Sequence, residues 1–196
     1  PDATLTKTLV DHEAPNTVGD DVGVGEPVTF EMVITVPQGT ADLILTDVMP
    51  DGLAAQSATF IGYNNAPGAS SDITAGASQS GVGDSGNIEI TANGDSVIFD
   101  FGTVVIPGDN DAEAVDTEIV VRVTALVEDD AVNVFDGATL QNTATLEVVD
   151  PDNPGTDLQD DVIATETVDV VEPDVEIVNA ASVGADPSKP ADGPHS

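Results

Sequence analysis

Alternation of apolar and polar residues runs along most of the chain and predicts β-strands. In the segment 27–36, Val28, Phe30, Met32 and Ile34 form one apolar row, because side chains two residues apart lie on the same face of a strand. No stretch shows the sustained 3.6-residue period of a helix. The pattern predicts nine strands in an all-β, Ig-like sandwich of about seven to nine strands. They lie near residues 3–10, 27–36, 42–48, 57–63, 87–92, 96–105, 117–127, 138–149 and 161–171.

Two segments stand outside this pattern. Residues 64–85 are rich in Gly, Ala, Ser and Asn and predict a long surface insertion, the best candidate for a variable or binding loop. Residues 173–179 (Pro-Asp-Val-Glu-Ile-Val-Asn) echo residues 1–7 (Pro-Asp-Ala-Thr-Leu-Thr-Lys). We therefore expect one sandwich over 1–172, and in 173–196 the start of a following repeat, a linker or a strand that pairs with a neighbouring subunit.

Three polar residues interrupt apolar rows, and they are the best clue to function. Lys7 falls in the row of Ala3, Leu5 and Leu9, while threonine fills the opposite row. Asn142 falls in the row that continues with Ala144, Leu146 and Val148. Asp47 shares a face with Leu43 and Leu45, although both rows of its segment are apolar. All three side chains are expected to point inward.

An inward lysine is chemically unusual, because burial disfavours the ammonium form and lowers its pKa. A neutral amine is a nucleophile. The chemistry requires that Asn142 faces Lys7 and that a protonated carboxyl group polarises the side-chain amide of Asn142. The Lys7 amine can then attack this amide, expel ammonia and leave an isopeptide bond. A simpler interpretation stays open: a buried salt bridge between Lys7 and Asp47, with Asn142 bonded to the backbone.

Asp100 is the second choice for the acid. It lies between Phe99 and Phe101, so it faces outward if both rings face the core. A bulge that shifts the alternation would change this. Glu31 is excluded by the same parity, since its neighbours Phe30 and Met32 take the apolar row.

Five segments in order carry a resemblance to a known family. They are Thr-Lys in the first strand, Gly-Glu-Pro-Val-Thr-Phe, Leu-Thr-Asp-Val-Met-Pro-Asp-Gly-Leu, Phe-Asp-Phe-Gly-Thr-Val and Leu-Gln-Asn-Thr-Ala-Thr-Leu. As a set, they make residues 1–172 similar to the DUF11-type repeats of bacterial surface proteins, described as isopeptide-forming fimbrial or adhesin domains. The resemblance implies a bond between a first-strand lysine and a last-strand asparagine, assisted by an acid. Here these would be Lys7, Asn142 and Asp47.

Composition narrows the partners. Three basic residues against 37 acidic ones give a net charge of −34, which repels nucleic acid and anionic membrane surfaces. Dissolved salt or bound calcium would reduce the repulsion between these carboxylates, so the composition favours a saline or calcium-rich medium. There is no cysteine, so a disulfide framework is excluded, and an isopeptide bond would replace it without an oxidant. No apolar run approaches the length of a membrane span.

Acidic loops are candidates for calcium. Asp109, Asp111, Glu113 and Asp116 crowd four carboxylates into eight residues between two strong strands, and calcium takes six to eight oxygen ligands. A second acidic loop spans 150–161. Neither has EF-hand spacing. No cofactor is required for the crosslink, and no motif of a hydrolase, a nucleotide-binding protein or a zinc enzyme is present.

Two functional hypotheses follow. The first is a structural stalk or filament module of an extracellular bacterial adhesin or fimbria, stabilised by the self-formed bond, with neighbouring repeats or subunits as partners. The second is a calcium-dependent module that binds a host or surface ligand, carbohydrate or protein. An enzyme with turnover is not expected, because the chemistry consumes its own side chains once. Because Pro1 is not a natural start, the expectation is a piece of a longer secreted protein, with any signal or anchor outside it.

Overall fold

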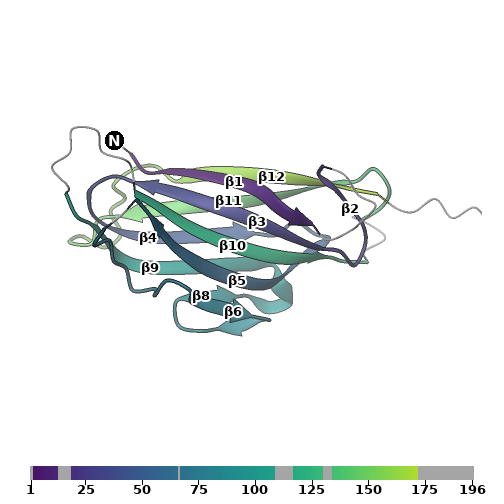
Figure 1. Ribbon diagram of the computed structural model, residues 1–196, viewed down its shortest axis with the longest axis horizontal. Coiled ribbons are helices and arrows are strands. Elements are labelled where there is room, and N and C mark those ends of the chain that lie inside the picture. The colour runs from purple at the N-terminus through teal and green to yellow at the C-terminus, as the bar shows by residue number, and fades with distance from the viewer. Residues whose placement is uncertain (1, 13–18, 66, 109–116, 130–133, 172–196) are drawn as a thin grey trace, which may run out of the picture.

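The chain forms a sandwich of two β-sheets, seen in a computed structural model that describes residues 2–12, 19–65, 67–108, 117–129 and 134–171 (Figure 1). The described residues hold twelve strands and one short 3₁₀-helix, η1 (Ala92–Gly94). All neighbouring strands are antiparallel except one pair. The all-β sandwich predicted from the sequence is confirmed. No described helix is long and apolar enough to cross a membrane.

The first sheet, called sheet A, has five strands in the order β1-β3-β10-β5-β6. Their bounds are β1 (Thr4–His12), β3 (Pro27–Val36), β10 (Thr117–Val127), β5 (Leu53–Asn64) and β6 (Ser78–Ser80). Threonine and other β-branched residues favour this pleated, half-buried surface. β1 is an edge strand, because only one of its sides is paired, with β3.

The second sheet, sheet B, has seven strands in the order β2-β12-β11-β4-β9-β8-β7. Their bounds are β2 (Asp21–Val22), β12 (Val162–Val170), β11 (Thr139–Val149), β4 (Gly39–Val48), β9 (Ser96–Ile106), β8 (Ile88–Ile90) and β7 (Gly83–Asp84). The short β2 is parallel to β12 and pairs only with Asp169 and Val170. The rest of the outer side of β12 pairs with no described strand.

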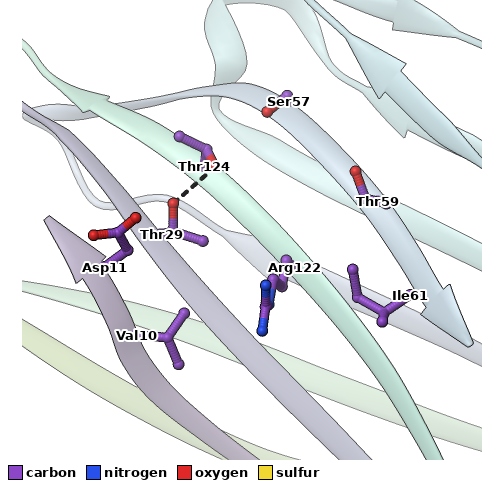
Figure 2. A pocket seen from close by; sticks show the side chains of 8 residues that line it. All are labelled: Val10, Asp11, Thr29, Ser57, Thr59, Ile61, Arg122 and Thr124. Atoms are coloured by element: carbon purple, nitrogen blue, oxygen red, sulfur yellow. Dashed lines mark hydrogen bonds between the residues drawn. The ribbon is translucent and has the colours of Figure 1, made fainter. Parts of the chain in front are cut away.

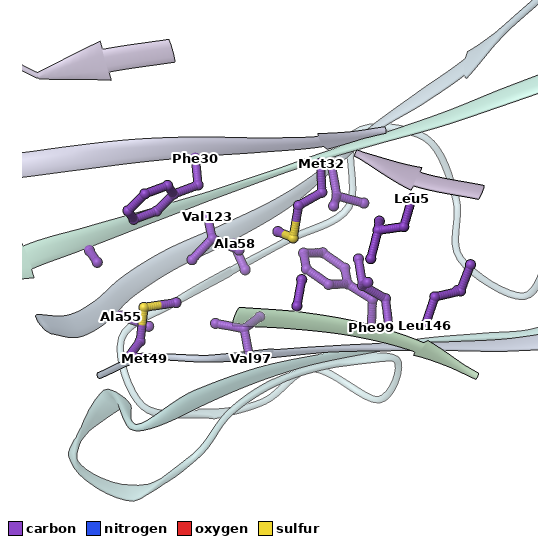
Figure 3. Packing of buried hydrophobic residues seen from close by; sticks show 14 of the residues in the cluster. Leu5, Phe30, Met32, Met49, Ala55, Ala58, Val97, Phe99, Val123 and Leu146 are labelled. Atoms are coloured by element: carbon purple, nitrogen blue, oxygen red, sulfur yellow. The ribbon is translucent and has the colours of Figure 1, made fainter. Parts of the chain in front are cut away.

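The core lies between the two sheets and is aliphatic with a few aromatic rings. Alternate residues of β3 are fully or almost fully buried, as the sequence pattern predicts. Figure 3 shows Phe30 and Met32 from sheet A meeting Val97, Phe99 and Leu146 from sheet B. Burial of such side chains contributes about 1.5–3 kcal/mol each. This apolar interior makes any unpaired ion inside it costly.

All nine predicted strands are present, with small differences at their ends. The insertion 64–85 is on the surface as expected, but it also contains structure that the sequence did not reveal. β6 extends sheet A, β7 extends sheet B, and the side chain of Ile73 is buried. The segment 173–196 lies outside the described residues, so its predicted role stays a prediction.

Candidate functional site

Lys7 points into the core from the edge strand β1. It is 6% exposed, and Thr6 and Thr8 on either side of it are exposed. Its register partner on β3 is Met32, and the same face of β3 supplies Phe30. The amine lies 3.9 Å from the Met32 sulfur and 5.0 Å from the centre of the Phe30 ring. The inward placement predicted from the alternation is confirmed.

Asp47 and Asn142 reach the same place from sheet B. Asp47 on β4 is paired in register with Ala144 on β11, and Asn142 lies two residues from Ala144. Side chains at this diagonal spacing share a face and are within reach of each other. Both residues are fully buried. Their inward placement is therefore also confirmed.

The Asp47 carboxylate joins the three residues. One of its oxygens, Oδ1, is in contact with the Lys7 amine as a buried ion pair and hydrogen bond. The other, Oδ2, accepts a 3.3 Å hydrogen bond from Nδ2 of Asn142. The salt bridge of the simpler interpretation is thus present, but Asn142 bonds Asp47 instead of the backbone. Lysine, acid and amide thus meet between the two sheets, with the acid in contact with both of the others.

Burial shifts both ionisable groups toward their neutral forms. Desolvation lowers the pKa of Lys7, although Asp47 opposes the shift by its charge and hydrogen bond and Glu166 opposes it by its charge. Desolvation raises the pKa of Asp47 against the opposing effects of Lys7 and Asn142. Each group thus moves toward the state that the chemistry requires, a free amine and a protonated acid.

The amide oxygen of Asn142 is the one buried side-chain polar atom, among the described residues, that has no hydrogen-bond partner. Leaving such an atom unsatisfied costs about 1–3 kcal/mol. A half-turn of the amide would exchange its oxygen and nitrogen positions. The oxygen would then face Asp47, which can donate to it when protonated.

Glu166 is a residue of this site that the sequence reasoning missed. It lies on β12 directly opposite Asn142, so the two share the inward face. The inward row of β12 is otherwise apolar: Val162, Ala164, Val168 and Val170. The same signal that singled out Lys7, a charge in an apolar row, could have found it. It was obscured because Ile163 falls in the opposite, polar row.

The two other acids weighed from the sequence lie elsewhere. Asp100 is exposed, whereas Phe99 and Phe101 are fully buried. The second choice for the acid is therefore wrong, because the register shift between β4 and β9 leaves this alternation intact. Glu31 faces outward, as expected, and pairs with Arg122 at 2.8 Å.

The calcium prediction is not tested by the structure. The loop with Asp109, Asp111, Glu113 and Asp116 lies outside the described residues. Within the described part, one group of three acids has oxygens close enough together for a metal: Asp20, Asp21 and Asp169 at the junction of β2 and β12. Exposed acids gather readily in a chain with this charge, so their proximity alone does not indicate a metal site.

A shallow hollow of about 440 Å³ lies on the outer face of sheet A (Figure 2). Arg122 lies at its middle, and the hydroxyls of Thr29 and Thr124 share a 2.9 Å hydrogen bond at its wall. The other lining residues are Val10, Asp11, Ser57, Thr59 and Ile61. No aromatic side chain lines it, so it offers no platform on which a sugar ring would stack.

Comparison with known proteins gives only distant likeness. No protein-family model matches the chain, and no curated protein matches it. The resemblance to DUF11-type repeats therefore stays a prediction. Solved structures with a similar fold include the major pilin subunit of Bacillus cereus (13% identity, TM-score 0.48) and the full-length major pilin of Corynebacterium diphtheriae (13%, 0.45). A non-cellulosomal cohesin from the archaeon Archaeoglobus fulgidus is also similar (11%, 0.45).

The alignments cover 87%, 85% and 88% of this chain, and 40%, 35% and 93% of the three neighbours. The chain thus spans less than half the length of either pilin. Scores at this level, shared by pilins and a cohesin, do not distinguish one function from another. What the protein does has to be inferred from the site.

Proposed function

We propose that this domain is a structural module of an extracellular bacterial surface protein or filament, covalently stabilised by an isopeptide bond between Lys7 and Asn142. One observation carries the proposal: a buried carboxylate, that of Asp47, contacts the lysine amine with one oxygen and the asparagine amide with the other. Neighbouring subunits or repeats are the expected partners. The bond is made once, so the domain is not an enzyme with turnover.

The reaction balances without a cofactor. The Lys7 ammonium gives one proton to the Asp47 carboxylate and becomes a free amine. The amine nitrogen attacks Cγ of Asn142 while the protonated Asp47 donates a hydrogen bond to the amide oxygen, which carries the developing negative charge. A second proton then passes from the lysine nitrogen to the departing nitrogen. The C–N bond of the primary amide breaks, ammonia leaves, and a secondary amide joins the two side chains.

The product is better suited to the core than the reactants. A buried ion pair often contributes nothing to stability, because desolvation offsets the attraction of the charges. The bond replaces the ammonium with an uncharged amide and leaves Asp47 protonated. Neutralisation of the site and closure of a long loop, which restricts the unfolded chain, both favour the folded state.

The test is the intact mass of the purified protein, measured after unfolding in acid, beside a Lys7→Ala variant. We expect the wild type to be lighter than its calculated mass by one ammonia and the variant to have its full mass. Peptide mapping should recover the branched peptide that contains Lys7 and Asn142. A wild type at full mass would refute the isopeptide bond and leave a buried ion pair.

A further inference from the structure

Glu166 is a charged residue that lies beside the buried site. It is half-buried, and it lies on β12 beside Asn142. β1 is the edge strand of sheet A, and β12 pairs with the short β2 only at Asp169 and Val170, so its outer side at Glu166 pairs with no described strand. β12 and β1 lie side by side (Figure 1). A double hydrogen bond between Gln159 and the backbone of Ala3 joins the segments at which they begin. Glu166 therefore lies on the inward face of β12, at the edge of the sandwich where β12 and β1 are neighbours.

A backbone group fixes the carboxylate at this edge. The N–H groups of Asp169 and Val171 bond to Asp20 and Val22 on the outer side of β12. Because backbone N–H groups alternate in direction along a strand, that of Thr167 points to the same outer side. There it donates a 3.1 Å hydrogen bond to Oε1 of Glu166. The side chain is thus held at the free edge of sheet B instead of extending into water.

Few charged groups act on the Lys7 amine. Within the described residues these are Asp47 from β4 and Glu166 from β12. β3 contributes an uncharged sulfur and a ring, and β11 contributes the neutral amide of Asn142. Glu31 on β3 faces away and pairs with Arg122. Asp47 has to give up its negative charge for the reaction, so Glu166 is the second anion that favours a charged lysine.

We propose that Glu166 is a positioning residue of this site, which holds the Lys7 side chain as an ammonium and thereby restrains crosslinking. Its effect on the rate of bond formation rests on the proposed function. The electrostatic part of the proposal concerns Lys7 alone. Glu166 exchanges no bond and no proton in the reaction, and it acts through its charge.

Glu166→Gln is a conservative test, because the amide oxygen can still accept the Thr167 hydrogen bond while the charge is lost. Chain recovered unfolded should be refolded at a series of pH values, quenched in acid at intervals and weighed. We expect the variant to lose ammonia several-fold faster than the wild type. Its rate profile should shift to lower pH, because without the carboxylate the free amine exists at lower pH. A slower or unchanged rate, with an unshifted profile, would overturn the proposal.

Glu147→Gln is the matched control. Glu147 lies on β11, near Asn142 in sequence, but is exposed on the outer face of sheet B. The substitution removes the same charge from the same sheet without facing Lys7. We expect its rate and pH profile to match the wild type. An equal effect of both substitutions would reveal general relief of the net charge and would also overturn the specific role of Glu166.

A second measurement separates this proposal from the crosslink itself. In an Asn142→Ala background no bond can form, and the chain has only two lysines, Lys7 and Lys189. NMR of ¹³C-labelled lysine can therefore follow the titration of Lys7 alone. Adding Glu166→Gln should lower the pKa of Lys7, and an unchanged titration would refute the electrostatic role. If the wild type shows full mass, the proposed function fails, and this titration still decides the role of Glu166.

Discussion

Asp47 is a fully buried carboxylate with two different partners. Its side chain is fully buried between the sheets and serves a cation and an amide at the same time. Removing one partner of a buried pair leaves an uncompensated charge, which costs about 3–5 kcal/mol. The acid is therefore needed both for the proposed chemistry and for the tolerance of an uncrosslinked Lys7.

Asp47→Asn removes the charge and the acid while keeping the size of the side chain, so it tests both roles without leaving a cavity. We expect no ammonia loss and a fall in the free energy of unfolding of about 3–5 kcal/mol relative to an Asn142→Ala variant, which cannot crosslink but keeps the pair of Lys7 and Asp47. Intact mass measures the loss of ammonia. Urea unfolding measures the change in stability, in about 1 M salt, where the Debye length is about 3 Å and the repulsion between surface acids is screened. Asp100→Asn is the control and should change neither. Ammonia loss in Asp47→Asn would remove Asp47 from the mechanism.

Sequence alone located most of this site, for a physical reason. Lys7 and Asn142 stand in rows where one face is apolar and the other polar, so their inward direction could be read directly. Asp47 was less clear, because both faces of β4 carry apolar residues. The meeting of the three could not be predicted from the rows, because it depends on which strands of the two sheets face each other. Glu166 was missed because Ile163, an apolar residue in the polar row of β12, obscures the alternation of that strand.

At the scale of elements, the insertion between β5 and β8 is attached to the sandwich more firmly than its composition suggests. Ser70 exchanges two backbone hydrogen bonds with Val105 on β9, at 3.1 and 2.9 Å. The N–H of Asp72 bonds to the carbonyl of Phe101 at 2.9 Å. Ile73 follows and buries its side chain, with 3% exposed. This half of the insertion is therefore part of the folded core.

Ile73→Ala tests that attachment. Removing a buried isoleucine side chain to the β-carbon costs about 2–5 kcal/mol, and we expect a loss of that order in urea unfolding. Val82→Ala is the control from the same insertion, because Val82 is 58% exposed, and it should have almost no effect. Equal, small effects of the two substitutions would mean that the insertion does not contribute to the core.

The long strands were predictable because a period of two persists over ten residues or so, as in β3 and β10. The short strands β2, β6 and β7 were not, because two or three residues carry no period. Their pairing comes from tertiary contacts. The order of strands within each sheet is likewise set by long-range contacts. Gly102 is an example. It has a positive φ of 56° beside the register shift between β4 and β9, and the neighbouring residues in the sequence do not predict this backbone conformation.

At the scale of the whole molecule, the place of Asn142 corrects one expectation. The sequence reasoning put the asparagine on the last strand, whereas it lies on β11 and the last described strand is β12. β1 begins at the end of the sandwich marked N, and β12 ends at the opposite end (Figure 1). Tension along the chain would thus pass from β1 through the crosslink into β11. β12 and the second half of β11 would remain outside the protected part.

Single-molecule pulling on the domain, held between handle domains, measures this directly. The 135 residue steps between Lys7 and Asn142 would extend by about 490 Å at about 3.6 Å per residue. We expect Lys7→Ala to release this length on unfolding and the wild type to withhold it. In the wild type the residues 143–171 should still yield about 100 Å. Equal extension of both proteins would show that no bond bears load.

The proposed bond between Lys7 and Asn142 would also change the topology of the chain. It would close a covalent ring that contains the whole of β3, β4, β5, β9 and β10 and the loops between them. A protease that cuts one loop inside this ring opens it without releasing a fragment. Two cuts are needed before any piece can leave. The proposed bond would therefore also make the domain tolerant of a single cut.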